Sequence, residues 1–411
     1  MRNSLLALTF CLPSCAAPKV VPRPASRPPA PPPAAPTEPA PSTREAPPPT
    51  RPDAAARARS SAIRDMVVPT PAERTFGPIE WLPGAENGFA VADELDRPLA
   101  LWIMSADPLS CDCPGELAGR RGNLGDPAVA PLLAECVGAA DIVWRMQTSD
   151  APAARHFRGA LDAPPTAGIH VLSPGGVRLG TARTLDVPDL EEALGAALEA
   201  WFALEPADRA LPPASGVERW TTRRPDTGLV LTAWGRDLGP ARGPRFRRDQ
   251  VWVERPDALA LVPPDPAPGA SADASALARA WARGAFLDDV RGAVAPFADA
   301  EVERARLTSE VVSVGAGGAV ELLLYGATRA VAAGVDGPRG VETTLVGAAT
   351  FDPDRGRFTA FDLVAEGERW GRTESNARRG EEAPSPIGFV LERTTDEALR
   401  LAAPRAVVGE G

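Results

Sequence analysis

Residues 98–114 read PLALWIMSADPLSCDCP. The apolar run at 99–104 has the length and continuity of a strand that is buried on both faces. Pro114 is typical of the first turn of a helix, so Cys111 and Cys113 are predicted to lie at a strand-to-helix junction. The unpaired N–H groups and partial positive charge of a helix N-terminus stabilise a thiolate and lower the pKa of the thiol. We therefore expect chemistry at this junction.

Helix and strand patterns alternate after the cysteines. The predicted elements are a helix, a strand, a short helix, a hairpin and a final helix with one apolar face. In chain order they cover 126–136, 140–146, 151–158, 169–181 and 186–202. Together with the strand at 99–104 they give the order strand, helix, strand, helix, hairpin, helix.

In this order and in several short motifs, residues 98–202 resemble the thioredoxin-like domains of exported bacterial proteins. The motifs are the apolar strand that follows Pro98, the cysteine loop, Asp-Pro-x-Val-x-x-Leu-Leu at 126–133 and Pro-Thr at 165–166 ahead of the hairpin. The resemblance implies that residues 72–205 form a thioredoxin-like α/β domain.

The resemblance also implies roles for individual residues. Cys111 and Cys113 would exchange electrons with envelope proteins that serve as thiol substrates, and no cofactor is implied. Pro165 matches the family's cis-proline and, with Thr166, would hold the substrate backbone. The cis form of an X–Pro bond costs only about 0.5–1 kcal/mol. This sequence departs from the family's Cys-x-x-Cys motif, because Asp112 alone separates the two cysteines.

Three interpretations of the cysteine pair stay open at this point. A disulfide between residues two apart closes a small, strained ring, and strained disulfides are easily reduced, which favours redox activity. Cysteines of exported proteins are commonly paired for stability, which favours a structural bond. Two thiolates at this spacing also suit Cu(I), but that ion needs a third ligand, and His156 and His170 are the only histidines. No metal site is therefore predicted.

Two other reactive side chains fall on apolar elements. Cys136 lies on the apolar face of its predicted helix, where a cysteine commonly behaves as a small hydrophobic residue. His170 lies inside an apolar strand, where a histidine with satisfied hydrogen bonds is the common case. Neither side chain is expected to take part in chemistry.

The first fifteen residues have the features of a bacterial export signal. Arg2 precedes an apolar run at 5–12, and the motif Leu-Pro-Ser-Cys follows at 12–15. This motif resembles the lipoprotein signal, in which the cysteine, here Cys15, becomes the lipid-modified first residue of the mature chain. The resemblance implies an exported protein of the periplasm or cell envelope that a lipid anchor holds at a membrane. Plain secretion is the alternative.

Residues 16–71 are predicted to form a disordered tether. Proline and alanine dominate between residues 22 and 52, and the segment has no periodic apolar face that it would bury by folding. In the polyproline II conformation a stretch of this length reaches on the order of 90 Å, at about 3.1 Å per residue. Such a tether would separate the folded part from the membrane.

Composition argues against several classes of protein. The 411 residues carry a formal net charge of −10, whereas proteins that bind nucleic acids need a basic surface. No run of about 18 apolar residues predicts a helix that spans a membrane. With two histidines a zinc hydrolase is not expected, and no phosphate-loop, dinucleotide or nucleophile-elbow motif is present. The oligomeric state is not predicted.

A Pro/Ala-rich linker at 206–215 leads to a second domain at 216–405, with a short tail at 406–411. This domain is predicted to be mainly antiparallel β, a curved sheet or partial barrel with one or two helices. The strand patterns lie at 227–235, 250–254, 302–314, 319–332, 341–352 and 357–366, and the clearest helix pattern lies at 272–283. The domain resembles no family of known function. The alternative to an enzyme is therefore a non-catalytic binding or scaffold lipoprotein, in which this domain binds a partner.

Arginine and aromatic residues alternate at the start of the second domain. They are Arg219, Arg223, Arg224, Arg236, Arg242, Arg245, Arg247 and Arg248, with Trp220, Trp234, Phe246 and Trp252. This pattern predicts either contact with an anionic polymer or lipid surface, or a strand face that is exposed to solvent.

Overall fold

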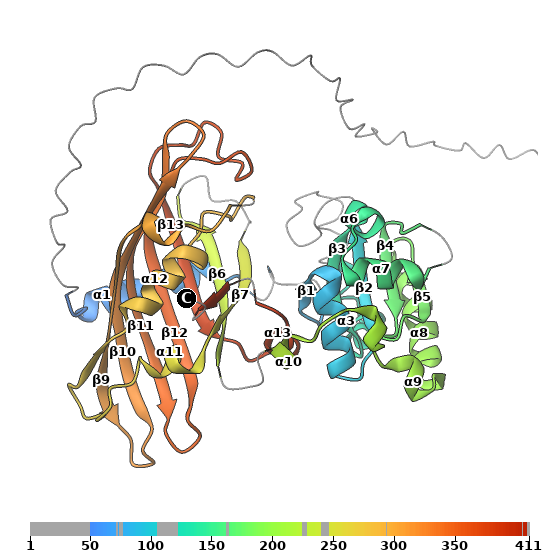
Figure 1. Cartoon of the computed structure of the whole chain (residues 1–411), viewed down its shortest axis with the longest axis horizontal. Helices are drawn as coiled ribbons and strands as arrows, with labels where there is room; N and C mark the ends of the chain where they lie inside the picture. Colours follow the sequence, from blue (N-terminus) through green and yellow to red (C-terminus); the bar gives the residue numbers. More distant parts are fainter. Residues whose placement is uncertain are drawn as a thin grey trace, which may run out of the picture. The chain divides into compact units, whose positions relative to one another are not determined.

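The computed structural model describes residues 50–70, 73, 77–104, 122–161, 164–223, 228–239, 246–292, 294–404 and 406–408. These residues form two sheets, one of five strands and one of nine (Figure 1). We call residues 77–203 the five-stranded region and residues 228–408 the nine-stranded region. None of the helices in the described ranges has the length and hydrophobicity that crossing a membrane requires.

The five-stranded sheet is mixed, with the strand order β1, β3, β2, β4, β5. The strands are β1 (Trp81–Pro83), β2 (Leu99–Met104), β3 (Val137–Ile142), β4 (Gly168–Leu172) and β5 (Arg178–Ala182). The first three are parallel to one another. β4 pairs antiparallel with β2, and β5 pairs antiparallel with β4.

Helices cover both faces of this sheet. They are α3 (Gly84–Glu94), α5 (Ala130–Ala134), α6 (Val143–Thr148), α7 (Pro152–Gly159) and α8 (Val187–Ala203). Leu101 of β2 shares one core cluster with Phe89 of α3 and Phe157 of α7. The next residue, Trp102, points to the opposite face and shares a second cluster with Leu194 of α8. Because both faces are covered, β2 is apolar throughout.

Several predicted elements of this region are confirmed, and one is wrong in part. The strand at 99–104 is β2, the hairpin is β4 and β5, and the final helix is α8. The strand predicted at 140–146 ends at Ile142, where α6 begins. Asp141 accepts a hydrogen bond from Arg145, four residues later, and a strand would hold these two residues far apart.

The helix predicted at 126–136 is shorter than expected, and α3 was not predicted at all. Only α5 is regular helix, although the predicted apolar face is buried at Val129, Leu133 and Cys136. Two glycines conceal the helical pattern of α3. A Cβ at Gly88 would lie 2.6 Å from the Cβ of Ala139, so glycine here allows the helix to approach the sheet closely.

The nine-stranded sheet is open, with the order β14, β7, β6, β13, β12, β11, β10, β9, β8. Neighbouring strands pair antiparallel, except that β14 pairs parallel with β7. The strands are β6 (Leu229–Asp237), β7 (Arg247–Val253), β8 (Ser271–Asp273), β9 (Val302–Val314), β10 (Val320–Ala333), β11 (Pro338–Asp352), β12 (Arg357–Trp370), β13 (Ser385–Arg393) and β14 (Ala406–Val408). The prediction of a mainly antiparallel sheet is confirmed, and the sheet does not close into a barrel.

Helices pack on both faces of this sheet. On one face, Trp281 of α12 (Ser275–Gly284) joins the main core cluster with Leu363 of β12. On the other face, Ile63 of α1 (Ala54–Val67) packs with Val364 of β12. Leu363 and Val364 are neighbours in the chain, so the alternation of a strand sends them to opposite faces.

Helix α1 corrects the predicted extent of the tether, which was expected to reach residue 71. Asp53 caps the helix by accepting a hydrogen bond from the N–H of Ala56 at 2.7 Å. Arg64 binds Glu392 of β13 at 2.7 Å and also pairs with Asp362 of β12. The alanines and arginines of this segment therefore form a helix with its own apolar stripe, which the compositional argument overlooked.

Two further boundaries differ from prediction. The expected tail at 406–411 begins as strand β14. The expected linker at 206–215 contains α9 (Pro206–Arg209) and the 3-10 helix η1 (Pro213–Ser215). Its backbone is held by the β4–β5 turn, because Ser173 Oγ donates to the Asp208 carbonyl at 2.7 Å. The remaining short helices are α10 (Trp220–Arg223), α11 (Arg255–Leu259), η2 (Asp299–Glu301) and α13 (Glu397–Leu401).

The arginine-aromatic stretch forms neither an anion-binding surface nor a solvated face at its two central arginines. Arg236 and Arg247 are 1% and 6% exposed. Arg236 Nη2 pairs with Glu73 Oε1 at 2.9 Å, and Arg247 Nη1 donates to the Ala285 carbonyl at 2.7 Å. Both predictions are therefore wrong for these side chains, which are internal and paired. Three others, Arg224, Arg242 and Arg245, lie outside the described residues.

Candidate functional site

Four strand ends meet at one edge of the five-stranded sheet. β1, β2 and β3 are parallel, so their C-terminal ends lie at the same edge. β4 starts there, because it runs antiparallel to β2 and its Gly168 pairs with Ile103. Asp141 of β3 pairs with Ile103 from the other side. We call this edge, which contains Pro83, Ile103, Asp141 and Gly168, the C-terminal edge.

The predicted substrate-binding residues, Pro165 and Thr166, precede Gly168 at this edge. Gln147 of α6 donates from Nε2 to the Pro165 carbonyl at 2.8 Å, and His170 Nε2 donates to the Thr166 carbonyl at 2.9 Å. No peptide bond in the described ranges is cis, so the expected cis form of Pro165 is wrong. Side chains of α6 and β4 therefore fix the backbone of this segment in an all-trans conformation.

The predicted catalytic residues Cys111 and Cys113, and the predicted lipidation site Cys15, lie outside the described residues. The chain leaves β2 at Met104, which pairs with Ile142 at the C-terminal edge. The strand that leads into the cysteine segment thus ends at the edge where β4 begins. This relation rests on backbone register alone.

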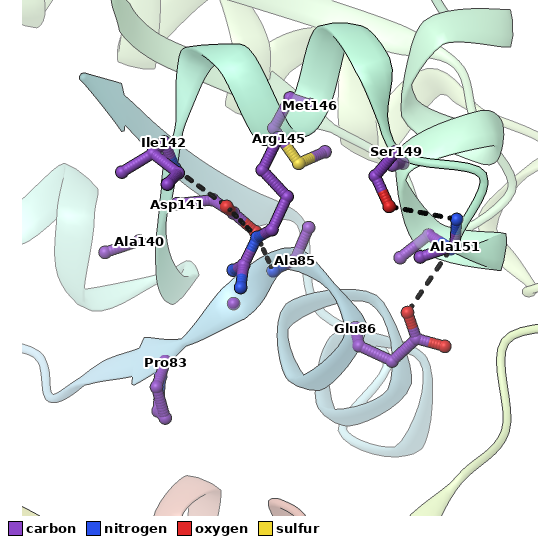
Figure 2. A pocket seen from close by; sticks show the side chains of 13 residues that line it. Pro83, Ala85, Glu86, Ala140, Asp141, Ile142, Arg145, Met146, Ser149 and Ala151 are labelled. Carbon is purple, nitrogen blue, oxygen red and sulfur yellow. Dashed lines mark hydrogen bonds and ion pairs between the residues drawn. The ribbon is translucent and has the colours of Figure 1, made fainter. Parts of the chain in front are cut away.

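A pocket of about 410 Å³ opens at the C-terminal edge (Figure 2). We call it the edge pocket; its walls come from the start of α3, the end of β3, α6 and the start of α7. Ala140, Met146, Ala153 and Ala154 give it an apolar lining, and none of them is more than 3% exposed. This volume is near the lower end of the range for ligand pockets, so it suits an apolar side chain or a small molecule.

An ion pair forms the polar side of the edge pocket. Asp141 is 4% exposed and binds Arg145 Nε at 2.7 Å. It also accepts the N–H groups of Ala85 and Ile142, at 2.9 and 2.7 Å. Figure 2 shows the Arg145 side chain reaching from α6 toward Asp141 and Ala85. A Cβ at Gly84 would lie 3.3 Å from Arg145 Nη2, so glycine leaves room for the guanidinium.

Glu86 supplies the other charged group of this pocket. Its carboxylate accepts a hydrogen bond from the N–H of Ala153, in the first turn of α7, at 3.4 Å. Partial burial of the carboxyl raises the pKa of Glu86, and the negative charge of Glu218 raises it further. The edge pocket is therefore a small apolar site with one internal ion pair and one carboxyl group that retains its proton more readily than usual.

Cys136 and His170 are buried in this region, as their apolar surroundings predicted. Burial raises the pKa of the Cys136 thiol to about 12. Burial also lowers the pKa of His170, which is 3% exposed. His156 Nε2 binds the Pro174 carbonyl at 2.8 Å. Within the described ranges, no three His, Cys, Asp or Glu side chains are grouped closely enough to hold a metal ion.

The sequence prediction missed Asp141, Arg145 and Glu86. One signal was available for Asp141, because an acidic residue inside the apolar run of β3 is unusual unless a partner compensates its charge. Arg145, four residues later, is that partner. Glu86 had no such signal, since α3 itself was not predicted and the contact with Ala153 spans 67 residues.

Comparisons with family models, with curated proteins and with solved structures find no significant match for this chain. Its function is therefore inferred from the geometry and chemistry of its own residues.

Proposed function

We propose that the five-stranded region is a thioredoxin-like domain that carries out thiol–disulfide exchange through Cys111 and Cys113. Its strand order, three parallel strands, antiparallel hairpin and covering helices all fit the arrangement that the sequence resemblance implies. The observation that carries the proposal is the pairing of Gly168 with Ile103. It brings the start of β4, just after Pro165, beside the end of the strand that leads to the cysteines.

The proposed reaction transfers two electrons without a cofactor. A thiolate of the pair attacks one sulfur of a substrate disulfide, forms a mixed disulfide and releases the other substrate sulfur as a thiolate, which takes up a proton. The second cysteine, as thiolate, then attacks the mixed disulfide and releases the reduced substrate. The domain ends with a bond between Cys111 and Cys113, and the substrate has gained both electrons. The reverse sequence oxidises a dithiol substrate.

The edge pocket supports a protein substrate for this reaction. It lies at the same sheet edge as Pro165, and its apolar lining suits a side chain next to the disulfide under attack. Pro165 and Thr166 lie in the segment that leads into β4 at this edge. Proteins commonly recognise an extended peptide by hydrogen bonds to its backbone and by pockets that accommodate alternate side chains.

The same proposal places the protein in the cell envelope. The basis is the sequence of residues 1–15, with lipidation at Cys15, and the proline-rich segment that follows as the tether up to α1. Envelope proteins that are exposed to oxidising conditions are then the thiol substrates. Mass spectrometry of the protein recovered from membranes tests this part, since a lipid-modified Cys15 as first residue is expected.

The redox test is a thiol titration of the mature chain in a series of glutathione buffers, together with an insulin-reduction assay. We expect reversible two-electron oxidation, and loss of activity in both Cys111→Ser and Cys113→Ser. Cys136→Ser is the matched control, because that thiol is buried and should be silent. A pair that stays locked as a disulfide, or thiols that stay inert in every buffer, would refute the redox proposal.

The second candidate is a binding or scaffold protein whose five-stranded region has no catalytic role. One observation favours it, namely a separate, strongly charged cavity in the nine-stranded region. Both roles can coexist in one chain, because the two sites share no residue.

A further inference from the structure

A second cavity, of about 710 Å³, is lined almost entirely by the nine-stranded region. It lies where the start of β6 and the ends of β7 and β13 meet α11, α13 and the turn between β11 and β12. Five arginines are among its described lining residues. They are Arg255, Arg355, Arg357, Arg393 and Arg400. We call this cavity the arginine pocket.

Most of these arginines have no partner among the residues that the structure describes. Arg355 pairs with Asp352, three residues earlier, at 3.5 Å. The other four side chains make no hydrogen bond or ion pair in the part of the chain that the structure describes. Glu94 is the one carboxylate among the described lining residues, and it accepts a hydrogen bond from Thr221 Oγ1 at 2.8 Å. The pocket therefore has a large excess of positive charge.

The positive charges lie close enough to affect one another. Arg393 is half-buried at the end of β13. Burial lowers the pKa of its guanidinium, and the charges of Arg400 and Arg357 lower it further. The Arg255 guanidinium lies against the β11–β12 turn, where a Cβ at Gly356 would lie 2.8 Å from Arg255 Nη2. A bound anion would relieve this repulsion, for which no described side chain compensates.

Apolar side chains complete the arginine pocket. Trp252, Phe351 and Phe358 are 8%, 7% and 4% exposed, and Leu229 and Ala258 are buried beside them. These walls would remove the hydrocarbon or aromatic part of a ligand from water. A fully hydrated inorganic ion would leave them unused. The ligand that fits both features has an anionic head and an apolar body.

We propose that the arginine pocket binds a phosphate monoester or diphosphate that carries an apolar group. A guanidinium presents a planar fork of N–H donors, which matches phosphate oxygens in pairs. Four such groups offer more donors than the two oxygens of a carboxylate can accept, whereas a phosphate ester has three terminal oxygens and up to two charges. The inference goes beyond the thiol chemistry, since it uses no residue of the C-terminal edge.

The charge of the pocket is a local feature of an acidic protein. The chain as a whole carries a formal net charge of −10, so an anion is not drawn to its surface in general. Other arginines of the same region are matched by carboxylates, as Arg378 is by Asp237 at 2.7 Å. A cluster of positive charge with apolar walls attracts and concentrates anions at one place.

The test is calorimetric titration of the purified full chain with octyl phosphate, inorganic phosphate and octanoate. We expect one saturable site for octyl phosphate, with an affinity about tenfold or more above those of the other two probes. Inorganic phosphate lacks the apolar body, and octanoate lacks the second charge and third oxygen. Equal affinity for octyl phosphate and octanoate would overturn the phosphate assignment, and no saturable binding of octyl phosphate would overturn the site itself.

Variants locate the binding. Arg393→Gln and Arg400→Gln should each weaken the binding of octyl phosphate about tenfold, because each removes one charge-assisted contact. Arg183→Gln is the matched control: Arg183 is exposed, lies outside the pocket and makes no side-chain hydrogen bond or ion pair in the described residues. The affinity of the Arg183→Gln variant for octyl phosphate should equal that of the unmodified chain. If all three variants bind equally well, the ligand does not occupy the arginine pocket.

The source of the phosphate is decided by flotation with phosphatidylcholine vesicles, with and without phosphatidic acid. Co-flotation with phosphatidic acid that is lost in Arg393→Gln identifies a lipid headgroup as a ligand of the site. Binding of soluble octyl phosphate without co-flotation identifies a soluble phosphate ester. The chain should be expressed without its first fifteen residues, so that a lipid anchor cannot cause the flotation.

Discussion

Arg378 and Arg393 both belong to the nine-stranded region, yet their surroundings are opposite. The Arg378 side chain is fully buried, and its guanidinium lies between Asp237 and Asp288. Two of its N–H groups bind the Asp237 carboxylate in parallel, at 2.7 and 2.8 Å. Arg393 lines an open pocket and has no carboxylate partner in the described residues. The fold supplies partners for the Arg378 guanidinium, whereas the Arg393 guanidinium is open to solvent and to a ligand.

The difference indicates which charges hold the fold together and which are available for binding. Arg378 connects three separate segments: Asp237 ends β6, Asp288 follows α12, and Arg378 itself lies between β12 and β13. Breaking a buried pair leaves an uncompensated charge in a medium of low dielectric constant, which is strongly destabilising. Removing an unpaired charge from a solvated pocket leaves nothing uncompensated. The change in the free energy of unfolding on substitution should therefore distinguish a buried, paired arginine from an unpaired arginine in a pocket.

The largest effect is expected for Arg378→Met, which keeps the length of the side chain and removes its charge. Asp288 would then be buried with no ion pair in the described residues, and Asp237 would keep only Arg291, so the free energy of unfolding should fall by about 3–5 kcal/mol at pH 7. Arg393→Met is the matched control and should change it by less than about 1 kcal/mol. Urea denaturation measures the free energy of unfolding of both variants. Similar losses in the two variants would contradict the comparison.

A smaller effect is expected from pH, because burial raises the pKa of Asp288 to about 6. In the unfolded chain an aspartate loses its proton near pH 4, so between about pH 4 and 6 the folded state binds more protons. The stability that Asp288 contributes is therefore present below about pH 4 and is lost as the pH rises through about 6. The loss is on the order of 3 kcal/mol.

Asp288→Asn is the variant that isolates this pH dependence. Its loss of stability between pH 4 and pH 6 in urea denaturation should be smaller than that of the unmodified chain by the contribution of Asp288, because Glu86 and Asp362, whose pKa burial also raises, contribute equally in both. Asp237 does not interfere in this range: burial would raise the pKa of Asp237, but the hydrogen bonds and charges of Arg378 and Arg291 outweigh burial and lower it. The stability that ionised Asp237 contributes is lost only below this pH range. Parallel pH curves for the variant and the unmodified chain would show that Asp288 does not titrate in this way.

In the edge pocket, Asp141 is buried and its partner Arg145 is partly exposed, and substitution of either is expected to change stability less than Arg378→Met. Asp141→Asn removes the charge that faces Arg145 and replaces one oxygen by an NH₂ group that cannot accept the N–H groups of Ala85 or Ile142. We expect a loss of about 1–3 kcal/mol in urea denaturation. Arg145→Gln leaves both N–H contacts of Asp141 intact, and Arg145 is 47% exposed, so about 1 kcal/mol or less is expected. A larger loss for Arg145→Gln than for Asp141→Asn would contradict this assignment.

The sequence predicted the elements whose apolar pattern is continuous. β2 and β9 were predicted with their observed bounds, since a run buried on both faces, or a long alternation, is visible without any tertiary information. α3 and β13 were not predicted. Glycines interrupt the pattern of α3, and β13 contains Pro386 and Gly388 although it lies in the interior of the sheet. In both, contacts with neighbouring elements outweigh local propensity.

The candidate sites were harder to predict, because they depend on contacts between distant residues. Pro165 was singled out through resemblance, and its position beside β2 follows from the pairing of β4. The stretch from Arg219 to Trp252 attracted attention for its arginines, yet Arg236 and Arg247 are buried and paired. The arginines of the arginine pocket that lack partners among the described residues are spread from 255 to 400, and no local pattern connects them. Only the fold of the sheet brings them to one cavity.

The smallest predicted effect is a gain in stability. Arg393→Gln removes the repulsion that Arg393 shares with Arg400 and Arg357, so the free energy of unfolding should rise by a few tenths of a kcal/mol at low salt. The gain should disappear in about 1 M salt, where charges are screened within about 3 Å. Arg183→Gln should show neither change. A loss of stability in Arg393→Gln at low salt would mean that Arg393, like Arg378, serves the fold, and the case for an external anion would then be weakened.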